Sequence, residues 1–341
     1  MTPTFDQLMQ RVREGRDLSR EEMADLFAEI MAGHLAPDAV ESFLRELSAK
    51  GETVDEIVGA AEVMRRHVTP IICNVPNAID TCGTGGDGIS TFNVSTAAAL
   101  VAAGAGAIVA KHGNRSNSRA SGSAEVLAEL GVNIDAPPEV VERCLREVGI
   151  GFLFAAKLHP AMANVVAIRR RIGKPTIFNL LGPLTNPAGV KRQIIGVPRA
   201  DLVDKVAAAL ARLGAVRAFV IHGRDGLCDL TITTESICAE VCNGAIAKRT
   251  IQPEDAGLSR AALDALRVSS PAESANVIRE ILDGQHGPAR DHTLLNAALA
   301  LVAADVAIDL KDGADRAAAS IDTGAARTVL KKLIEISGVD A

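Results

Sequence analysis

The sequence has no tryptophan, no tyrosine and only eight phenylalanines, so aromatic residues make up 2% of its 341 positions. Proteins that bind single-stranded nucleic acid by stacking its bases need more aromatic side chains than this. An excess of positive charge is also missing, because 36 Lys and Arg stand against 42 Asp and Glu and give a net charge of −6. Nucleic-acid binders usually carry a basic surplus. Both shortages argue against a nucleic-acid partner.

The chain also lacks a long apolar run, a secretory signal and closely paired cysteines. Its longest uninterrupted apolar stretch, residues 97–110, falls short of the roughly 20 residues that cross a bilayer. Residues 1–17 alternate charged and apolar side chains, which does not fit a signal peptide. The six cysteines form no CxxC pair and have no histidine at zinc-ligand spacing. We therefore expect a cytoplasmic protein with reduced thiols and no membrane contact.

The hydrophobic period changes near residue 77. Residues 1–66 show only helical periodicity, with a capping box at Ser19 and Glu22. From residue 77 onwards, short apolar runs alternate with helical segments, which predicts a largely parallel sheet with helices on its faces. The predicted strands include 78–82, 108–110, 151–155 and 218–221. The length suits an α/β protein in which a small all-helical domain precedes a large α/β domain with a mostly parallel central sheet.

Two later signals refine this interpretation. Asn243 and Gly244 stand between two segments of period two, which predicts a β-hairpin. Ser270 precedes Pro271 at the start of a helical stretch, which is typical of a helix N-terminus.

Polar residues gather directly after the first predicted strand, in segment 80–96. Its four glycines permit tight turns and let backbone N–H groups approach an anion, and hydroxyl and amide side chains follow at a helix start. Gly83, Gly85 and Gly88 match GxGxxG, but no acidic residue follows about 20 positions later, so a dinucleotide site is not favoured. Ligands of doubly wound folds bind where strands end. The segment therefore predicts a phosphate site, with a plain glycine turn as the alternative.

A second polar cluster, residues 111–123, follows the next predicted strand. It carries the cations Lys111, Arg115 and Arg119 together with six hydroxyl or amide side chains, in a chain whose overall charge is negative. A lone basic run is most often a solvated loop. Because this run follows a strand next to the first cluster, we expect a site for a polyanionic ligand.

The two clusters resemble those of the anthranilate phosphoribosyltransferases of tryptophan biosynthesis. The resemblance covers essentially the whole chain and is carried by GTGGDGISTFNVST (83–96), KHGNR (111–115), GSAEVLAELG (122–131), HPAM (159–162) and TIFNLLGPLTNP (176–187). It implies transfer of a phosphoribosyl group from 5-phosphoribosyl 1-diphosphate (PRPP) to the amine of anthranilate, with Mg²⁺ and with release of pyrophosphate.

The resemblance also implies how the chain is divided. A small helical domain of residues 1–66 and about 160–184 would hinge against a large α/β domain of residues 67–159 and 185–341. Two chains would form a homodimer through their helical domains.

The resemblance assigns the site residues one by one. It implies anthranilate contacts at Gly83, Asn114 and Arg169, and metal ligands at Ser95 and Asp229. Arg169 suits a carboxylate because a guanidinium grips it at two points, but Arg169 is one of three consecutive arginines and a place on the helix surface fits the sequence equally well. The implied PRPP-binding residues are Gly83, Gly86, Asp87, Thr91, Asn93, Val94, Ser95, Thr96, Lys111, His112, Gly113, Asn114, Arg115, Ser116, Asn117, Ser118, Arg119 and Ser123.

One segment departs from the family pattern. Where the family has an adjacent Asp-Glu pair that binds magnesium, this sequence has Cys228 and Asp229. Magnesium prefers hard oxygen ligands, which a thiol does not supply. We therefore expect a weakened second metal site, unless Asp225 or Glu235 replaces the lost carboxylate.

The departure leaves other functions open. One is a diverged phosphoribosyltransferase-fold protein that uses another acceptor or only binds its ligand. Another is a non-catalytic nucleic-acid-binding relative, against which the acidic charge balance counts. The third is a nucleoside phosphorylase of the same superfamily, against which the KHGNR motif counts.

Overall fold

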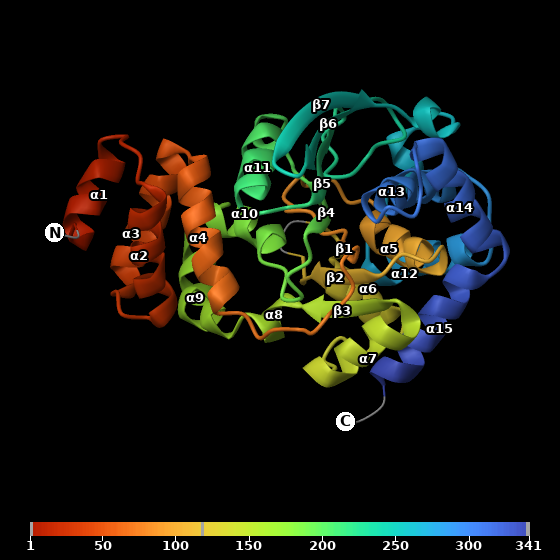
Figure 1. The fold of residues 1–341 in the computed structure, drawn as a ribbon, viewed down its shortest axis with the longest axis horizontal. Helices are drawn as coiled ribbons and strands as arrows, with labels where there is room; N and C mark the ends of the chain where they lie inside the picture. Colours follow the sequence, from red (N-terminus) through yellow and green to blue (C-terminus); the bar gives the residue numbers. More distant parts are fainter. Residues whose placement is uncertain (1–2, 117–118, 339–341) are drawn as a thin grey trace.

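The computed structural model describes residues 3–116 and 119–338. Helices from the N-terminal part of the chain lie at one end of the molecule, and a central sheet with helices on both faces makes up the rest (Figure 1). The N-terminal helices are α1 (Phe5–Arg13), α2 (Arg20–Ala32), α3 (Pro37–Lys50) and α4 (Val54–Arg66).

Local sequence explains where these helices begin. Three of them start at a capping box, in which the N-cap side chain and the side chain three residues later each bind the other's backbone N–H. The predicted box at Ser19 and Glu22 is confirmed. Helix α3 begins instead at Pro37, a residue that suits the first helical turn.

The central sheet has seven strands in the order β3-β2-β1-β4-β5-β6-β7. Strands β1 to β5 pair in parallel, and β6 and β7 extend the sheet with antiparallel pairing. The prediction of a mostly parallel sheet is confirmed. The strands are β1 (Ile79–Asp80), β2 (Val109–Gly113), β3 (Ile150–Phe154), β4 (Arg192–Gly196), β5 (Arg217–Gly223), β6 (Ser236–Cys242) and β7 (Ala245–Ile251).

The predicted hairpin is the β6–β7 pair. Asn243 and Gly244 form its turn with φ of 48° and 86°, the two positive values that a type I′ turn requires.

The remaining helices cover the sheet or connect its strands. Helix α12 has Ser270 as its N-cap, as predicted. Within the described ranges, none of the helices is both long and apolar enough to cross a membrane. These elements are α5 (Val94–Gly104), α6 (Ser123–Glu129), α7 (Pro138–Val148), α8 (Ala155–Leu158), η1 (Pro160–Met162), α9 (Ala163–Ile172), α10 (Ile177–Leu184), α11 (Asp201–Arg212), η2 (Pro253–Ala256), η3 (Leu263–Leu266), α12 (Pro271–Leu282), α13 (Pro288–Ala303), α14 (Leu310–Asp322) and α15 (Ala325–Ser337).

Both faces of the sheet are buried. On β5, Phe219 and Ile221 join the hydrophobic cluster formed with α5, α13 and the C-terminal helices, whereas Ala218 and Val220 join the cluster formed with α11 and the N-terminal helices. Successive side chains of a strand point to opposite faces, so a strand between two helical layers reads as a continuous apolar run.

Helices α9 and α10 pack with the N-terminal helices, although β1, β2 and β3 lie between them in the sequence. The rings of Phe27 in α2 and Phe178 in α10 have centroids 5.2 Å apart. The side-chain amide of Asn164 in α9 donates to the carbonyl of Met31, at 2.8 Å. The segment after His159 therefore belongs to the helical end of the molecule.

Two strands differ from their predicted lengths. Strand β1 ends at Asp80 rather than at Cys82, and the chain then enters the glycine loop. The carbonyl of Thr81 accepts a hydrogen bond from the Lys111 side chain at 3.3 Å. Strand β2 extends to Gly113, which pairs with Phe154. Lys111 therefore lies on a strand and not, as predicted, in a loop.

Candidate active site

The glycine-rich segment after β1 forms a loop at the carboxyl end of the parallel strands. Gly85, Gly86 and Gly88 have φ of 63°, 91° and 69°, which side chains with a Cβ rarely adopt. The N–H of Thr84 donates to the carbonyl of Gly196 at the end of β4, at 2.8 Å. The loop is therefore held against the neighbouring strand.

The loop after β1 and the loop after β2 are joined by hydrogen bonds. Arg119 Nε donates to Asp87 Oδ1 at 2.6 Å, and the N–H of Ala120 donates to Ser90 Oγ at 3.1 Å. Asn93 Nδ2 donates to the carbonyl of Ser121 at 3.3 Å. The two polar clusters of the sequence therefore form one site.

Several predicted residues of the first loop are buried rather than open. Asn93 uses its side chain to hold the loops together, since its Oδ1 also accepts from Ser274 Oγ at 2.8 Å. Thr91, Val94 and Thr96 are almost fully buried. The hydroxyls of Thr91 and Thr96 have no hydrogen-bond partner among the described residues.

Lys111 is the most informative residue of the site. Its side chain reaches from β2 to the residue after β1 and to the start of α5, since Nζ donates to Thr81 Oγ1 at 3.3 Å and to Ser95 Oγ at 3.4 Å. The residue is 1% exposed, and burial lowers the pKa of its ammonium. In the described part of the chain, no carboxylate lies within 4.0 Å of Nζ. A buried cation at a helix N-terminus without a carboxylate partner points to an anionic ligand.

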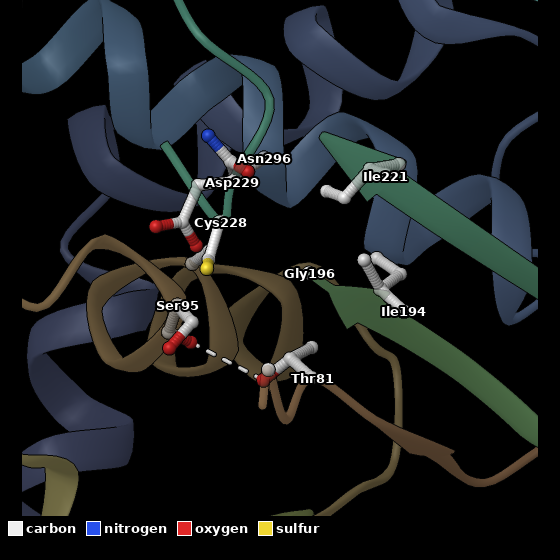
Figure 2. Close-up of a pocket in the computed structure, with 10 residues that line it drawn as sticks. Thr81, Ser95, Ile194, Gly196, Ile221, Cys228, Asp229 and Asn296 are labelled. Carbon is white, nitrogen blue, oxygen red and sulfur yellow. Dashed lines mark hydrogen bonds between the residues drawn. The ribbon is translucent and has the colours of Figure 1, made fainter. Parts of the chain in front are cut away.

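A pocket lies between the start of α5 and the loop after β5. In Figure 2, the Asp229 carboxylate and Ser95 lie on opposite sides of it, and the Cys228 thiol points into the same space. Burial raises the pKa of Asp229 above its ordinary value, while the nearby charge of Arg119 lowers it. The residues lining the pocket are Thr81, Gly83, Ser95, Ala98, Ile194, Gly196, Ile221, Cys228, Asp229 and Asn296.

Helix α13 fixes the position of Asp229 through the next residue. Asn296 accepts from the N–H of Leu230 at 3.1 Å and donates to its carbonyl at 2.9 Å. His292 Nε2 lies 2.7 Å from the same carbonyl. Asn296 and His292 are therefore positioning residues that sequence reasoning missed. The available signal was that Asn296 is a lone polar residue in the apolar second half of this helix.

Cys228 is held by its backbone and buried. Its N–H donates to Asp87 Oδ2 at 3.0 Å, and its Sγ lies 3.7 Å from the carbonyl of Gly85. A Cβ added at Gly196 would lie 1.5 Å from the Cys228 carbonyl, so only glycine allows this close approach. Burial, together with the Asp87 charge, raises the pKa of the thiol well above its ordinary value.

The other face of β1 and β2 carries a buried histidine pair. His112 Nε2 and His159 Nε2 are 3.1 Å apart. Burial lowers the pKa of His112 to about 3, with a smaller contribution from the neighbouring His159, and burial also lowers the pKa of His159 to about 4. The pair links the end of β2 to the segment that leads into α9.

Asp80 organises the same face, a role that sequence reasoning missed. Its carboxylate accepts from the N–H of His112 at 3.1 Å and from Asn186 Nδ2 at 2.8 Å. Burial raises the pKa of Asp80 to about 6. Donor atoms of Asp80, Cys82 and His112 lie within 4.8 Å of one another, but since both Asp80 oxygens are already hydrogen-bonded, we assign the group to anchoring β2.

The second loop turns back on itself. Asn114 Oδ1 accepts from the N–H of Arg115 at 2.8 Å, and Arg115 lies over the Phe154 ring at 5.9 Å. Ser123 begins α6, and its hydroxyl donates to the carbonyl of Asn114. The N–H of Ser116 lies 3.3 Å from the Glu125 carboxylate, so Glu125 helps to shape the loop.

Three predicted residues of this loop remain. A Cβ added at Gly113 would lie 2.2 Å from Ser123 Oγ and 2.7 Å from Phe152 Cε2, so a larger residue here would displace these side chains. Asn117 and Ser118 lie outside the described residues.

Arg169 differs from the two arginines that follow it. Its guanidinium lies 5.4 Å from the centre of the Phe178 ring, and burial lowers its pKa. Arg170 and Arg171 are exposed, and Arg171 pairs with Glu41 at 2.9 Å. No carboxylate among the described residues pairs with Arg169, so its guanidinium can bind an anionic ligand. It lies on α9, on the helical side, whereas Gly83 and Asn114 lie at the sheet edge.

The buried histidines make the protein acid-sensitive. His112, His159 and His292 have pKa values of about 3, 4 and 4 when folded, below the ordinary 6.5. The unfolded chain therefore binds protons that the folded chain does not, and the free energy of unfolding falls as the pH drops below about 6.5, by about 1.4 kcal/mol per pH unit for each histidine. Asp80 opposes this between pH 6 and 3.8 because its pKa is raised on folding.

Urea unfolding at several pH values measures the effect. We expect stability to decrease steadily from pH 7 to pH 4.5, and His292→Gln, which keeps a donor for the Leu230 carbonyl, to reduce the slope by about one proton. A stability that stays constant over this range, or an unchanged slope in the variant, would contradict the assignment of neutral buried histidines.

The fold and the site correspond to a known class of enzyme. The chain matches the helical bundle domain of a glycosyl transferase family over residues 6–68 and the a/b domain of the same family over residues 75–327. The protein is therefore a glycosyl transferase with a helical and an α/β part, as its two-part fold indicates.

Full-length relatives define the family more closely. Anthranilate phosphoribosyltransferase of Anaeromyxobacter dehalogenans (strain 2CP-C) is 52% identical over 97% of this chain and 98% of its own length, and that of Pelobacter propionicus is 48% identical over 96% and 97%. The crystal structure of the Thermus thermophilus enzyme has a TM-score of 0.92 at 39% identity, covering 97% of this chain and 99% of that one. The chain belongs to the anthranilate phosphoribosyltransferase family.

This membership settles the reaction among the alternatives that the sequence left open. The protein is an enzyme that transfers the phosphoribosyl group of PRPP to the amine of anthranilate and releases pyrophosphate, a step of tryptophan biosynthesis. A yeast anthranilate phosphoribosyltransferase solved in complex with PRPP and Mg has a TM-score of 0.89 at 27% identity, covering 98% of this chain and 97% of that one.

Proposed function

We propose that the chain binds the diphosphate of PRPP between its two joined loops, residues 83–96 and 111–123. The observation that carries this proposal is the buried ammonium of Lys111, which reaches the start of α5 without a carboxylate partner among the described residues. Backbone N–H groups of the glycine loop and of the first turn of α5 are suited to the same anion. The PRPP-binding residues are those that the family resemblance assigns.

We propose that Ser95 and Asp229 hold Mg²⁺. They fit this ion because both offer hard oxygen donors, and because Asp229 is a buried carboxylate whose only cationic contact among the described residues is Arg119, at 3.7 Å. When bound, Mg²⁺ neutralises charge that develops on the departing pyrophosphate.

We propose that anthranilate lies between Arg169 and the sheet edge at Gly83 and Asn114, with its carboxylate on the Arg169 guanidinium. The guanidinium is half-buried and has no carboxylate partner among the described residues, which supports this placement, because such a group gains from a planar anion.

The chain's own residues then act by positioning and electrostatics. An aromatic amine is unprotonated at neutral pH and needs no base before it attacks. Displacement at the anomeric carbon passes through a cationic, oxocarbenium-like state, as in glycoside chemistry. Lys111 and the loop N–H groups stabilise the leaving pyrophosphate, and Arg169 holds the amine in line with the anomeric carbon.

We also propose that residues 1–66 and about 160–184 form a domain that hinges against residues 67–159 and 185–341. Packing of α9 and α10 with α2 and α3 supports the grouping. We propose that two chains form a dimer through this domain, and light scattering is expected to give the mass of a dimer. The protein is cytoplasmic in this proposal, which its six free cysteines support.

A steady-state assay of phosphoribosyl transfer to anthranilate with titrated Mg²⁺ tests the proposed function. We expect saturable turnover that depends on all three components. No turnover at saturating metal, with PRPP binding intact, would instead indicate a ligand-binding protein, and turnover only with another amine would indicate another acceptor.

A further inference from the structure

Cys228 removes one carboxylate from the segment that carries Asp229, and the two acidic residues nearest in sequence do not replace it. Asp225 is fully engaged, because its Oδ1 accepts from the N–H of Leu227 at 3.2 Å and its Oδ2 accepts from the hydroxyls of Thr231 and Thr233, each at 2.6 Å. Glu235 pairs with Arg224 at 3.3 Å near the surface. Both carboxylates therefore have other partners in this structure, and neither takes the place of the missing ligand.

The Asp87 carboxylate is not free to bind a metal ion either. One of its oxygens accepts from the N–H of Ile89 at 3.2 Å and from Arg119 Nε at 2.6 Å, and the other accepts from the N–H of Cys228 at 3.0 Å and from Arg119 Nη2. The Cys228 thiol offers a soft sulfur donor, which a hard divalent ion such as Mg²⁺ does not prefer. Asp229 therefore remains as the one carboxylate of this segment that faces the pocket.

A fixed cation, Arg119, lies beside Asp229. Arg119 Nη2 is 3.7 Å from Asp229 Oδ2, and the Arg119 side chain is 15% exposed. A guanidinium stays charged in proteins, and the bonds to Asp87 hold this one in place beside Asp229. Its bonds to Asp87 use Nε and Nη2, and among the described residues none accepts from Nη1.

We propose that Arg119 supplies, next to Asp229, the positive charge that a second divalent ion would otherwise supply, so that this chain binds PRPP with one divalent ion. A guanidinium offers a planar fork of donors to phosphate oxygens. Asp229 is the one pocket-facing carboxylate of this segment, so no further carboxylate is left here to hold a second ion. This inference rests on the proposed PRPP site. It specifies further that one divalent ion is bound there and that Arg119 takes the place of a second ion.

The test counts bound Mn²⁺, which stands in for Mg²⁺, in the presence of saturating PRPP, by electron paramagnetic resonance of the free ion. PRPP affinity is measured in parallel by calorimetry at saturating Mn²⁺. We expect one ion per chain in the parent protein. We expect Arg119→Gln to keep one ion but to weaken PRPP binding by about thirtyfold, the effect of losing a charged hydrogen-bond donor.

A double variant tests whether the Arg119 guanidinium takes the place of a second metal ion. Cys228→Asp combined with Arg119→Gln restores the carboxylate and removes the competing cation, and we expect it to bind two ions. Arg119→Lys keeps the charge and is expected to bind PRPP within a few-fold of the parent, which separates a loss of charge from a loss of fold. Arg224→Gln, which removes a surface ion pair near the same segment, is the matched control and should change neither quantity.

Two bound ions in the parent protein, one ion in the double variant, or unchanged PRPP affinity in Arg119→Gln would each overturn the inference. Failure of the proposed PRPP site looks different, because the parent protein would then bind no PRPP at any Mn²⁺ concentration.

Discussion

Lys111→Met is expected to lower kcat/KM for PRPP by about a thousandfold, which corresponds to about 4 kcal/mol of lost attraction between the ammonium and the diphosphate at an effective dielectric of about 20. The loss is large because the charge acts in a buried place, between Thr81 and Ser95 at the start of α5. Water does not replace the missing cation there.

The same substitution is expected to leave the free energy of unfolding unchanged or to raise it. A buried ammonium without a carboxylate partner carries a desolvation cost in the folded state, and an apolar side chain of similar length removes that cost. The lost donor to the Thr81 carbonyl works in the opposite direction by about 1 kcal/mol.

Steady-state kinetics and urea unfolding of the same preparation separate the two effects. Lys157→Met is the control, since Lys157 is half-exposed and pairs with Asp135 at 3.2 Å outside the proposed site. If Lys111→Met retained most of its activity, or lost activity only because it unfolded, Lys111 would not be the diphosphate-binding cation.

Arg169→Ala is expected to raise the KM for anthranilate about 10- to 150-fold, as for loss of a hydrogen-bonded charged partner, with little change in the KM for PRPP. The reason is the position of the guanidinium, which lies half-buried over the Phe178 ring on the helical side of the molecule.

The neighbouring Arg170 provides a matched control for this variant. Arg170 is exposed one position further along the same helix, so Arg170→Ala should leave both KM values unchanged. Equal increases in the two KM values for Arg169→Ala would show that the residue supports the site as a whole and does not hold the acceptor.

Much of the fold could be predicted from local sequence. Ser19 with Glu22, Asn243 with Gly244 and Ser270 before Pro271 specify a helix start, a hairpin turn and another helix start through contacts within a few residues, and all three are confirmed. The alternation of apolar runs with helices likewise predicted the parallel sheet, because strands buried on both faces need continuous apolar sequence.

The lengths of β1 and β2 could not be predicted in the same way. Lys111 shows why: its backbone pairs with β3 as part of β2, while its side chain donates to the Thr81 carbonyl just after β1. Sequence patterns predict a loop at a polar residue such as Lys111, although here the residue is buried on a strand where it can bind a ligand.

The candidate site shows a similar limit. The sequence placed the two loops at neighbouring strand ends, and the bonds of Asn93 to Ser121 and of Asp87 to Arg119 bring them together. Whether Asp225 was free to bind metal depended on the hydroxyls of Thr231 and Thr233, which only the folded loop places around it.

The central claim is that the loops after β1 and β2 together grip one sugar diphosphate. A crystal structure of this protein with PRPP and Mg²⁺ tests it most directly. We predict a diphosphate group in hydrogen-bond contact with Lys111 Nζ and the first turn of α5, and an ion on Ser95 and Asp229. PRPP bound on another surface, with Lys111 still buried among protein groups alone, would contradict the account.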